Sequence, residues 1–280
     1  MRVDLLLVEK GMAPSRNRAQ ELIASGKVYL VVDGQKRVIR KASVKVEPDA
    51  ELFVEADANE FVSRGGIKLK GALDRTGLDV RGVYALDVGI STGGFTDCLL
   101  QKGARFVVGV DVGHDQLAAK LRNDPRVKLF EGVNARDLSQ TPLRETIQGR
   151  KFDLIVVDVS FISLTLVLPE LIQYLDDRGH LLALVKPQFE VGREGLGKNG
   201  IVKNPELYRN VEEKIRNACT ACALTVEDYF ESSIEGSDGN REFFVFAKHA
   251  QLVLGALGDE FDSGKRSSDL SGMSAPQESQ

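Results

Sequence analysis

The sequence of 280 residues is poor in cysteine and has no long apolar run. Its three cysteines are too few for a disulfide framework, and reduced thiols are typical of the cytosol. No run approaches the roughly 20 apolar residues of a membrane-spanning helix. The N-terminus carries Asp4 and Glu9 where a signal peptide has its apolar core. The sequence therefore predicts a cytoplasmic protein without a membrane partner.

Candidate metal ligands are equally sparse. Cys219 and Cys222 form one C-x-x-C pair, but no second pair follows and the three histidines lie far away in the sequence. Because the segment also has the pattern of a helix, we expect neither a metal site nor a redox function there.

The net charge of the whole chain differs in sign from the charge of its first 50 residues. With 42% hydrophobic and 28% charged residues, the composition is that of a globular protein, and the formal net charge of −4 alone argues against a nucleic-acid binder. Residues 1–50, however, hold ten Lys or Arg against six Asp or Glu. Such a local basic face is the electrostatic footprint of nucleic-acid binding. The polar tail, residues 258–280, is expected to be disordered.

The stretch VYALDVGISTGGF, residues 83–95, has the pattern of a strand, a tight turn and a helix. In open α/β sheets this turn lies where nucleotide-like ligands bind, and glycines let the backbone approach the ligand. The spacing differs from the G-x-G-x-x-G of dinucleotide folds, which favours S-adenosylmethionine, a ligand without a pyrophosphate. The next strand ends in an aspartate placed like the acidic residue that binds a ribose. The expected cofactor-binding residues are Asp87, Gly89, Ser91, Gly93, Gly94 and Asp111.

The first 58 residues are expected to form a small α+β domain. Asp4 is interpreted as the cap of a first helix and Ser15 as the start of a second. Two strands, over residues 27–35 and 44–56, are expected to follow and to be joined by a hairpin at Asp33.

This small domain resembles the αL RNA-binding domain of ribosomal protein S-four, which tyrosyl-tRNA synthetases and pseudouridine synthases share. The matching residues are Arg2, Asp4, Asp33-Gly34 and the segment Ser15-Arg16-x-x-Ala19-x-x-Leu22-Ile23-x-x-Gly26-x-Val28. Contacts with RNA phosphates position a protein without reading the RNA sequence. The resemblance assigns such contacts to Arg2, Arg16, Arg18, Lys27 and, after a polar linker over residues 59–63, Arg64.

Polar residues stand where the apolar strands of the second domain, residues 64–250, end. Asp158 closes one strand, Lys186 closes another, and Glu242 opens the last. Strands alternating with helices predict a parallel sheet covered on both faces, with ligands at the carboxyl ends of its strands. Lys68 is expected in the first turn of a helix, an odd place for a cation beside the positive end of the helix dipole. Because an unpaired lysine at the end of a buried strand is costly, we expect Lys186 to have an acidic partner, for which Asp158 and Glu242 are available.

The order Lys68, Asp158, Lys186, Glu242 resembles the K-D-K-E set of the FtsJ-like RNA ribose 2'-O-methyltransferases. With the motifs SRGGIKL, DVGISTGGF, VDVSFIS, VKPQFEVG and GNREFF on an αL domain, the chain resembles the TlyA family, known as haemolysins and as ribosomal RNA 2'-O-methyltransferases.

The resemblance implies a Rossmann-like α/β fold with a seven-stranded, mostly parallel sheet, preceded by the small RNA-binding domain. It implies methylation of ribosomal RNA, on a cytidine 2'-oxygen, with ribosomal RNA or ribosomal subunits as the partner. The chain begins almost directly at Arg2, without the basic extension of members that modify both subunits, which favours large-subunit RNA. The resemblance also places an acidic or amide side chain near the adenine, and Asn134 is the candidate within residues 134–137.

The implied reaction is an in-line displacement in which a ribose 2'-hydroxyl attacks a methyl group. Lys186 is predicted to accept the proton or to activate the hydroxyl, because burial and a second cation, Lys68, favour a neutral lysine. Asp158 and Glu242 would orient the lysines, but if placed too close they would hold Lys186 charged and oppose its role as a base. A Gly-rich loop, residues 190–205, is interpreted as a lid or substrate clamp.

Two alternatives stay open. A non-catalytic RNA-binding or ribosome-assembly factor would bind RNA without methyl transfer. A membrane-active haemolysin would require an insertion segment or a secretion signal, and we find neither in the sequence.

Overall fold

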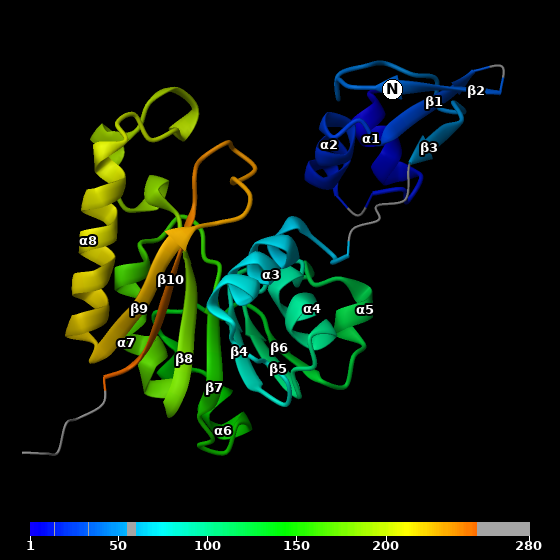
Figure 1. Ribbon diagram of the computed structural model, residues 1–280. Coiled ribbons are helices and arrows are strands. Elements are labelled where there is room, and N and C mark those ends of the chain that lie inside the picture. The colour runs from blue at the N-terminus through cyan, green and yellow to red at the C-terminus, as the bar shows by residue number, and fades with distance from the viewer. Residues whose placement is uncertain (14, 33, 55–59, 251–280) are drawn as a thin grey trace, which may run out of the picture.

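The computed structural model describes residues 1–13, 15–32, 34–54 and 60–250 (Figure 1). Three expectations therefore lie outside the described residues, wholly or in part. These are the disordered tail, Asp33 of the hairpin, and the linker, of which residues 60–63 are described.

The small N-terminal domain has two helices packed on a three-stranded antiparallel sheet with the strand order β2-β1-β3. Its core is formed by buried aliphatic side chains from both helices and from β1, among them Leu6, Leu7, Ile23 and Val28. The serine expected to start the second helix does so, because Ser15 Oγ accepts a hydrogen bond from the backbone N–H of Arg18 at 3.3 Å. The elements are α1 (Val3–Glu9), α2 (Arg16–Ala24), β1 (Val28–Val32), β2 (Gln35–Ile39) and β3 (Leu52–Val54).

Two expectations for this domain are wrong. Asp4 does not cap α1: the helix begins at Val3, and the buried Asp4 carboxylate is bonded by Arg2, which precedes α1, and by Arg16 of α2. The partner of β1 across the hairpin is β2, whereas the expected second strand begins only at Leu52. Four of the five residues of β2 are exposed, so its sequence lacks the apolar alternation by which strands are recognised.

The second domain is built on one seven-stranded sheet with the strand order β6-β5-β4-β7-β8-β10-β9. The pairings are parallel from β6 to β8, and β10 runs antiparallel to both of its neighbours. The expected α/β fold with a mostly parallel seven-stranded sheet is therefore confirmed. Its strands are β4 (Tyr84–Val88), β5 (Phe106–Val110), β6 (Val127–Phe130), β7 (Phe152–Val157), β8 (Leu175–Val185), β9 (Leu224–Glu231) and β10 (Phe243–His249).

Helices cover both faces of this sheet. One buried cluster joins β4, β7 and β8 to α6, α7 and α8, and a second joins the opposite face to α3, α4 and α5. Every residue of β4 is buried, as expected for the centre of a parallel sheet. The helices are α3 (Arg64–Thr76), α4 (Gly94–Gln101), α5 (Ala119–Arg122), α6 (Leu143–Thr146), α7 (Leu168–Leu171) and α8 (Glu206–Ala221).

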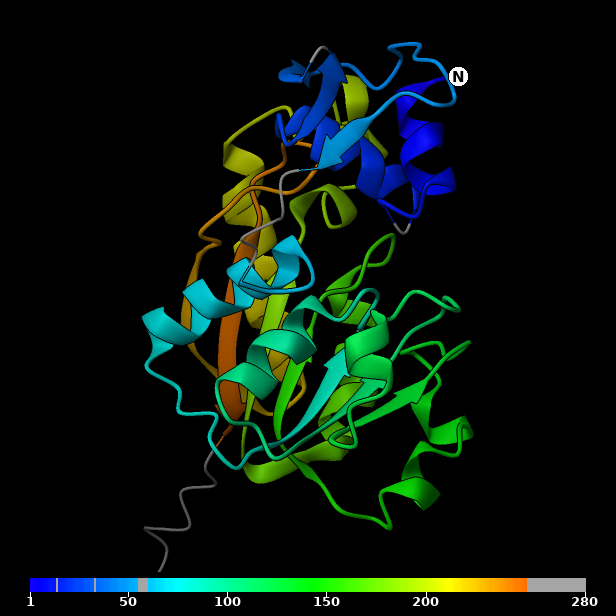
Figure 2. The same cartoon turned by 90° about the vertical axis from the view of Figure 1, so that its right-hand side faces the viewer.

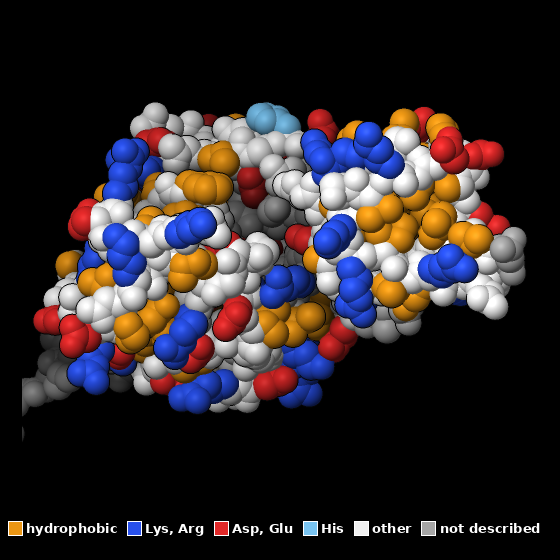
Figure 3. All heavy atoms as spheres, turned by 90° about the horizontal axis from the view of Figure 1, so that it is seen from above, with side chains coloured by type: hydrophobic (Ala, Val, Ile, Leu, Met, Phe, Trp, Pro, Cys, Tyr) orange, Lys and Arg blue, Asp and Glu red, His pale blue; other side chains and the backbone are white. Residues whose placement is uncertain are grey.

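The small domain lies at the end of the seven-stranded sheet where the prospective ligand site is found. Figures 1 and 2 both place the small domain above the carboxyl ends of the parallel strands, next to α3. Seen from above, this end of the molecule is hollowed between the domains, and both basic and acidic side chains lie around the hollow (Figure 3).

Candidate functional site

The turn after β4 is shaped for close approach of a ligand to the backbone. Gly89 has φ +82°, and a Cβ atom there would lie 2.5 Å from the carbonyl oxygen of Asp158. Gly93, with φ +93°, precedes α4, and a Cβ there would meet the side chains of Leu117 and Leu121. Both positions therefore require glycine, because φ is positive and a Cβ atom would collide with neighbouring parts of the chain; Gly89 also lines both chambers described below.

Asp111, at the end of β5, fixes this turn from the neighbouring strand. Its carboxylate accepts hydrogen bonds from the backbone N–H groups of Ser91 and Gly113, both at 2.8 Å. Ser91 has a positive φ of 46°, an uncommon conformation for a side chain other than glycine. The structure thus brings the expected residues Gly89, Ser91 and Asp111 together at one edge of the sheet.

Asp87 is a buried carboxylate with one unsatisfied oxygen. Its Oδ2 accepts a hydrogen bond from Thr96 Oγ1 at 2.6 Å, whereas its Oδ1 has no partner among the described residues. Burial raises the pKa of Asp87 to about 7, and the nearby carboxylates of Asp158 and Asp111 add to the effect. A cationic ligand close to Asp87 would favour the ionised carboxylate and so lower its pKa.

Two chambers open on either side of the turn. The first, of about 280 Å³, is lined by Lys68, Lys186 and residues of the turn, and the second, of about 480 Å³, by Asp111, Asn134 and apolar side chains. Both chambers share Gly89, Ser91, Asp158 and Ser160. The second chamber combines apolar walls with a few polar groups, which is typical of small-molecule and cofactor sites.

Asn134 lies at the wall of the second chamber, whereas Asp137 is not among its lining residues. The Oδ1 atom of Asn134 accepts a hydrogen bond from the backbone N–H of Arg136 at 3.0 Å. This bond directs the side-chain amide, so that its Nδ2 atom is the group left to donate to a ligand.

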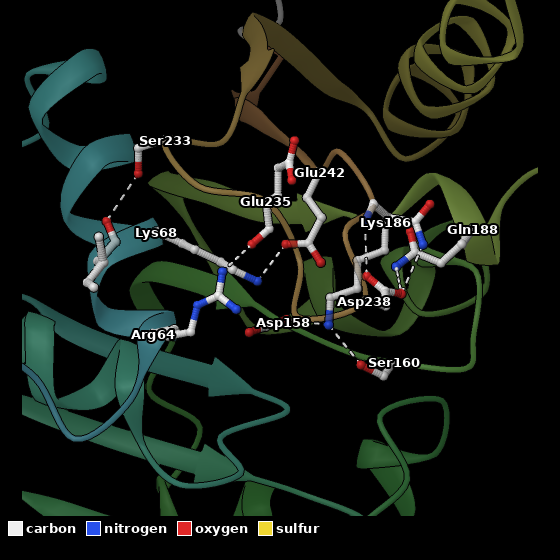
Figure 4. A network of polar contacts seen from close by, with 12 residues as sticks. Arg64, Lys68, Asp158, Ser160, Lys186, Gln188, Ser233, Glu235, Asp238 and Glu242 are labelled. Carbon is white, nitrogen blue, oxygen red and sulfur yellow. Dashed lines mark hydrogen bonds and ion pairs between the residues drawn. The ribbon is translucent and has the colours of Figure 1, made fainter. Parts of the chain in front are cut away.

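Four charged residues form two ion pairs at the first chamber, which Lys68, Lys186 and Asp158 line and behind which Glu242 is buried (Figure 4). Lys68 Nζ lies 2.5 Å from Glu242 Oε2, and the two side chains are 10% and 4% exposed. Lys186 Nζ lies 2.7 Å from Asp158 Oδ1. The structure therefore supplies the acidic partner that the sequence led us to expect for Lys186, and it also gives Lys68 one.

The local positions of two of these residues differ slightly from expectation. Lys68 is the fifth residue of α3 and so lies in its second turn, because the helix begins at Arg64 and includes the Gly65-Gly66 pair. Glu242 immediately precedes β10 instead of opening it.

Two residues that connect the ends of β7 and β8 were not predicted from the sequence. Ser160 Oγ accepts a hydrogen bond from Lys186 Nζ at 2.8 Å. Glu190, buried after β8, accepts hydrogen bonds from Ser163 Oγ at 2.6 Å and the backbone N–H of Leu164 at 2.7 Å. Glu190 thereby ties the segment after β7 to the segment after Lys186. The motifs VDVSFIS and VKPQFEVG contain both residues, but only the fold brings the motifs together.

The loop expected to act as a lid lines neither chamber. Residues 190–205 fold back on themselves, with a bridge between Leu196 and Val202. Buried Asn240 holds the loop, because its Oδ1 accepts from the N–H of Val202 and its Nδ2 donates to the carbonyl of Gly200. The structure therefore shows an anchored loop beside the turn that carries Glu242.

Two of the five residues expected to contact RNA, Arg2 and Arg16, share a partner. Arg2 and Arg16 meet around the Asp4 carboxylate, while Arg18 pairs with Glu21 at 2.8 Å. Glu21 also lines the first chamber. The remaining two are Lys27, which follows α2 and directly precedes β1, and Arg64, which donates to the carbonyl oxygen of Glu235 at 2.7 Å and lines the first chamber.

The cysteine pair lies in an apolar environment. Cys219 and Cys222, at the end of α8, are buried, and burial raises the pKa of the Cys219 thiol to about 12. Within the described ranges, no group of three or more His, Cys, Asp or Glu side chains is placed to hold a metal ion. A helix long and apolar enough to cross a membrane is likewise absent from the part of the chain that the structure describes.

Comparison with known families divides the chain as the fold does. Residues 61–249 match the FtsJ-like methyltransferase model, and residues 1–52 match the S4 domain model.

Individual relatives extend over almost the whole chain. The 16S/23S rRNA (cytidine-2'-O)-methyltransferase TlyA of Mycobacterium tuberculosis is 43% identical over 92% of this chain and 94% of its own length. Hemolysin A of Brachyspira hyodysenteriae is 36% identical over 88% of this chain and 98% of its own. A solved structure of a hemolysin candidate from Streptococcus thermophilus, 38% identical, covers 89% of this chain and 88% of its own with a TM-score of 0.69.

Proposed function

The chain belongs to the FtsJ-like methyltransferase family, and on this premise we propose that it methylates a ribose 2'-oxygen of ribosomal RNA with S-adenosylmethionine. The observation that carries the proposal is that Lys68, Lys186 and Asp158 line one chamber beside the glycine turn, with Lys186 paired to Asp158 and Lys68 paired to the buried Glu242. The M. tuberculosis relative is named as a cytidine-2'-O-methyltransferase, which supports the 2'-oxygen of a cytidine as the acceptor.

The residues of the turn fit S-adenosylmethionine. The unpaired Asp87 Oδ1 atom suits the positive charge at the methionine end, and the glycine backbone allows close approach. Asp111 would accept hydrogen bonds from the ribose, and Asn134 would donate to the adenine between apolar walls. When bound, the cofactor supplies an activated methyl group on a positively charged sulfur.

Of the two roles expected for Lys186, the geometry supports the activating one. The Lys186 ammonium lies against both Asp158 and Ser160, which is the close arrangement that opposes a role as proton acceptor. A positioned ammonium can donate to the 2'-oxygen and stabilise the negative charge that develops on it during the attack. Asp158 and Ser160 would fix the direction in which Lys186 donates.

The pair Lys68–Glu242 would form the second wall of the acceptor site. Glu242 lies close to the backbone of Gly236: a Cβ atom on Gly236 would be 2.8 Å from Glu242 Oε1. The two side chains are nearly buried, so Glu242 would hold the Lys68 ammonium in a fixed orientation at the wall of the first chamber.

The small domain would bind the RNA partner and deliver it to the chamber. Its match to the S4 domain model and the placement of Arg64 and Glu21 at the first chamber support a continuous path for RNA between the domains. We place the domain boundary at residues 59–63 and the working compartment of the enzyme in the cytoplasm, where ribosomal subunits are found.

Methyl transfer to purified small and large ribosomal subunits tests the proposal. Labelled S-adenosylmethionine should mark ribosomal RNA, and nucleoside mass spectrometry should identify 2'-O-methylcytidine. Label that appears only on a nucleobase, or no label while the cofactor remains bound, would contradict the proposal.

A further inference from the structure

A buried carboxylate connects two of the arginines on the small domain. Asp4 lies in α1 with no exposed side-chain surface, and Arg2 holds it through two bonds, from Nε and Nη2, both at 2.9 Å. Arg16, at the start of α2, donates from Nε at 3.0 Å, and Gln20 completes the set at 2.9 Å. One carboxylate thus fixes side chains from α2 and from the segment before α1.

The side chains of the two arginines remain partly exposed. The Arg2 side chain is 39% exposed and the Arg16 side chain 52% exposed. A guanidinium carries five N–H donors, and Asp4 takes two from Arg2 and one from Arg16. Three donors of Arg2 and four of Arg16 therefore remain to bind a ligand.

We propose that Asp4 is the positioning residue of a two-arginine phosphate clamp, in which Arg2 and Arg16 are held ready for one phosphate of an RNA backbone. This inference rests on the proposed function, because it requires that the small domain binds RNA. The fork of an arginine matches a phosphate in shape, and a guanidinium fixed in advance loses less side-chain freedom on binding.

The clamp and simple electrostatics predict opposite effects of Asp4→Asn on the affinity for RNA. Asp4→Asn removes a negative charge close to the RNA site, so Coulomb attraction alone would tighten binding to phosphates. If Asp4 holds the arginines in position, the same change should weaken RNA binding by roughly fivefold, because two side chains must then be ordered on binding. The matched control is Asp49→Asn, which removes an exposed acid of the same domain and should leave affinity unchanged or slightly higher.

The experiment is fluorescence anisotropy with the full chain and a labelled stem-loop of ribosomal RNA over a range of salt concentrations. Asp4→Asn is compared with wild type, with Asp49→Asn, and with the same change in an Arg2→Ala/Arg16→Ala background. In that background the effect of Asp4→Asn should disappear, because the residues through which Asp4 acts are gone. An equal loss in both backgrounds, or tighter binding by the single variant, would overturn the clamp.

Two further controls separate the possible failures. Thermal unfolding shows whether Asp4→Asn leaves the small domain folded; if it does not, Arg16→Lys takes its place, since it keeps the charge but lacks the planar fork. Arg16→Lys should also weaken binding, and unchanged affinity would overturn the clamp. If the wild-type chain itself does not bind the RNA, the proposed function fails; if it binds and Asp4→Asn matches Asp49→Asn, only the clamp fails.

Discussion

Lys186 Nζ and Asp158 Oδ1 lie 2.7 Å apart, at the adjacent carboxyl ends of β8 and β7. The chain brings these residues together only through the parallel pairing of the two strands. Because Ser160 also accepts from the Lys186 ammonium, the lysine has a fixed direction at the point where the two chambers meet.

The first prediction concerns the role of this ammonium. Lys186→Ala should lower the rate of methyl transfer by roughly a hundredfold or more. Lys186→Arg keeps a positive donor and should retain more activity than Lys186→Ala, because the account requires a charge near the 2'-oxygen and not a proton acceptor. Single-turnover rates at saturating cofactor measure both effects. Equal inactivity of the two variants, with cofactor affinity intact, would favour Lys186 as a base.

The second prediction concerns the stability provided by the buried pair. Glu242→Gln leaves the Lys68 ammonium without its partner, and removing one partner of a buried ion pair costs about 3–5 kcal/mol. Urea denaturation should show a loss of this size. Asp79→Asn, which breaks an exposed pair with Arg81, serves as the control and should have a much smaller effect. Similar midpoints for the two variants would show that the Lys68–Glu242 pair is solvated.

The third prediction is a pH dependence of cofactor binding. The pKa of Asp87 is raised to about 7, mainly by burial, so below this pH the carboxyl is largely protonated. A cationic ligand favours the ionised form, so affinity should rise with pH by up to tenfold per unit until about pH 7 and then level off. Isothermal titration calorimetry at several pH values measures this, and Asp87→Asn should remove the dependence. A flat profile for the wild type would contradict the placement of the positive charge near Asp87.

The same pKa shift predicts the sign of a stability change in the free protein. Between about pH 4 and about pH 7 the folded state retains a proton that the unfolded state has released. The contribution of Asp87 to stability therefore falls as the pH rises through this window. Thermal unfolding of wild type and Asp87→Asn over the window should show a smaller decline in the variant.

The fourth prediction concerns the backbone of the turn. Gly89→Ala places a Cβ 2.5 Å from the Asp158 carbonyl at a φ of +82°, so the turn must shift and cofactor affinity should fall by at least tenfold. Gly82→Ala is the matched control, because Gly82 has a similar φ of +74° but open space around its Cβ position. Gly82→Ala should reduce stability and leave cofactor affinity unchanged. Equal affinities of the two variants would mean that the turn does not contact the cofactor.

The sequence predicted those features that depend on local pattern. Near-continuous apolar strands alternating with helices predicted the parallel sheet, and the glycine turn and Asp111 lie side by side because adjacent parallel strands end at one edge. The presence of an acidic partner for Lys186 followed from the cost of burying an unpaired charge, and the structure shows that this partner is Asp158.

Features that depend on tertiary contacts could not be predicted in this way. Asp4 has the residue type of a helix cap, yet its carboxylate is used by Arg2 and Arg16, and Arg16 lies twelve residues away in the chain. Ser160 and Glu190 make their hydrogen bonds because the fold brings the ends of β7 and β8 together. Strand β2 is mostly exposed and has no apolar face, so its sequence lacks the pattern from which a strand is predicted.

The most direct test of the account is methyl transfer to a ribosomal RNA whose modified nucleotide, once mapped, is replaced by its 2'-deoxy form. The account predicts that this single missing oxygen abolishes labelling, while binding of the RNA and of the cofactor persists. Continued labelling at that nucleotide would show that the acceptor is a base atom, and would contradict the assignment of the Lys186–Asp158 and Lys68–Glu242 chamber to ribose methylation.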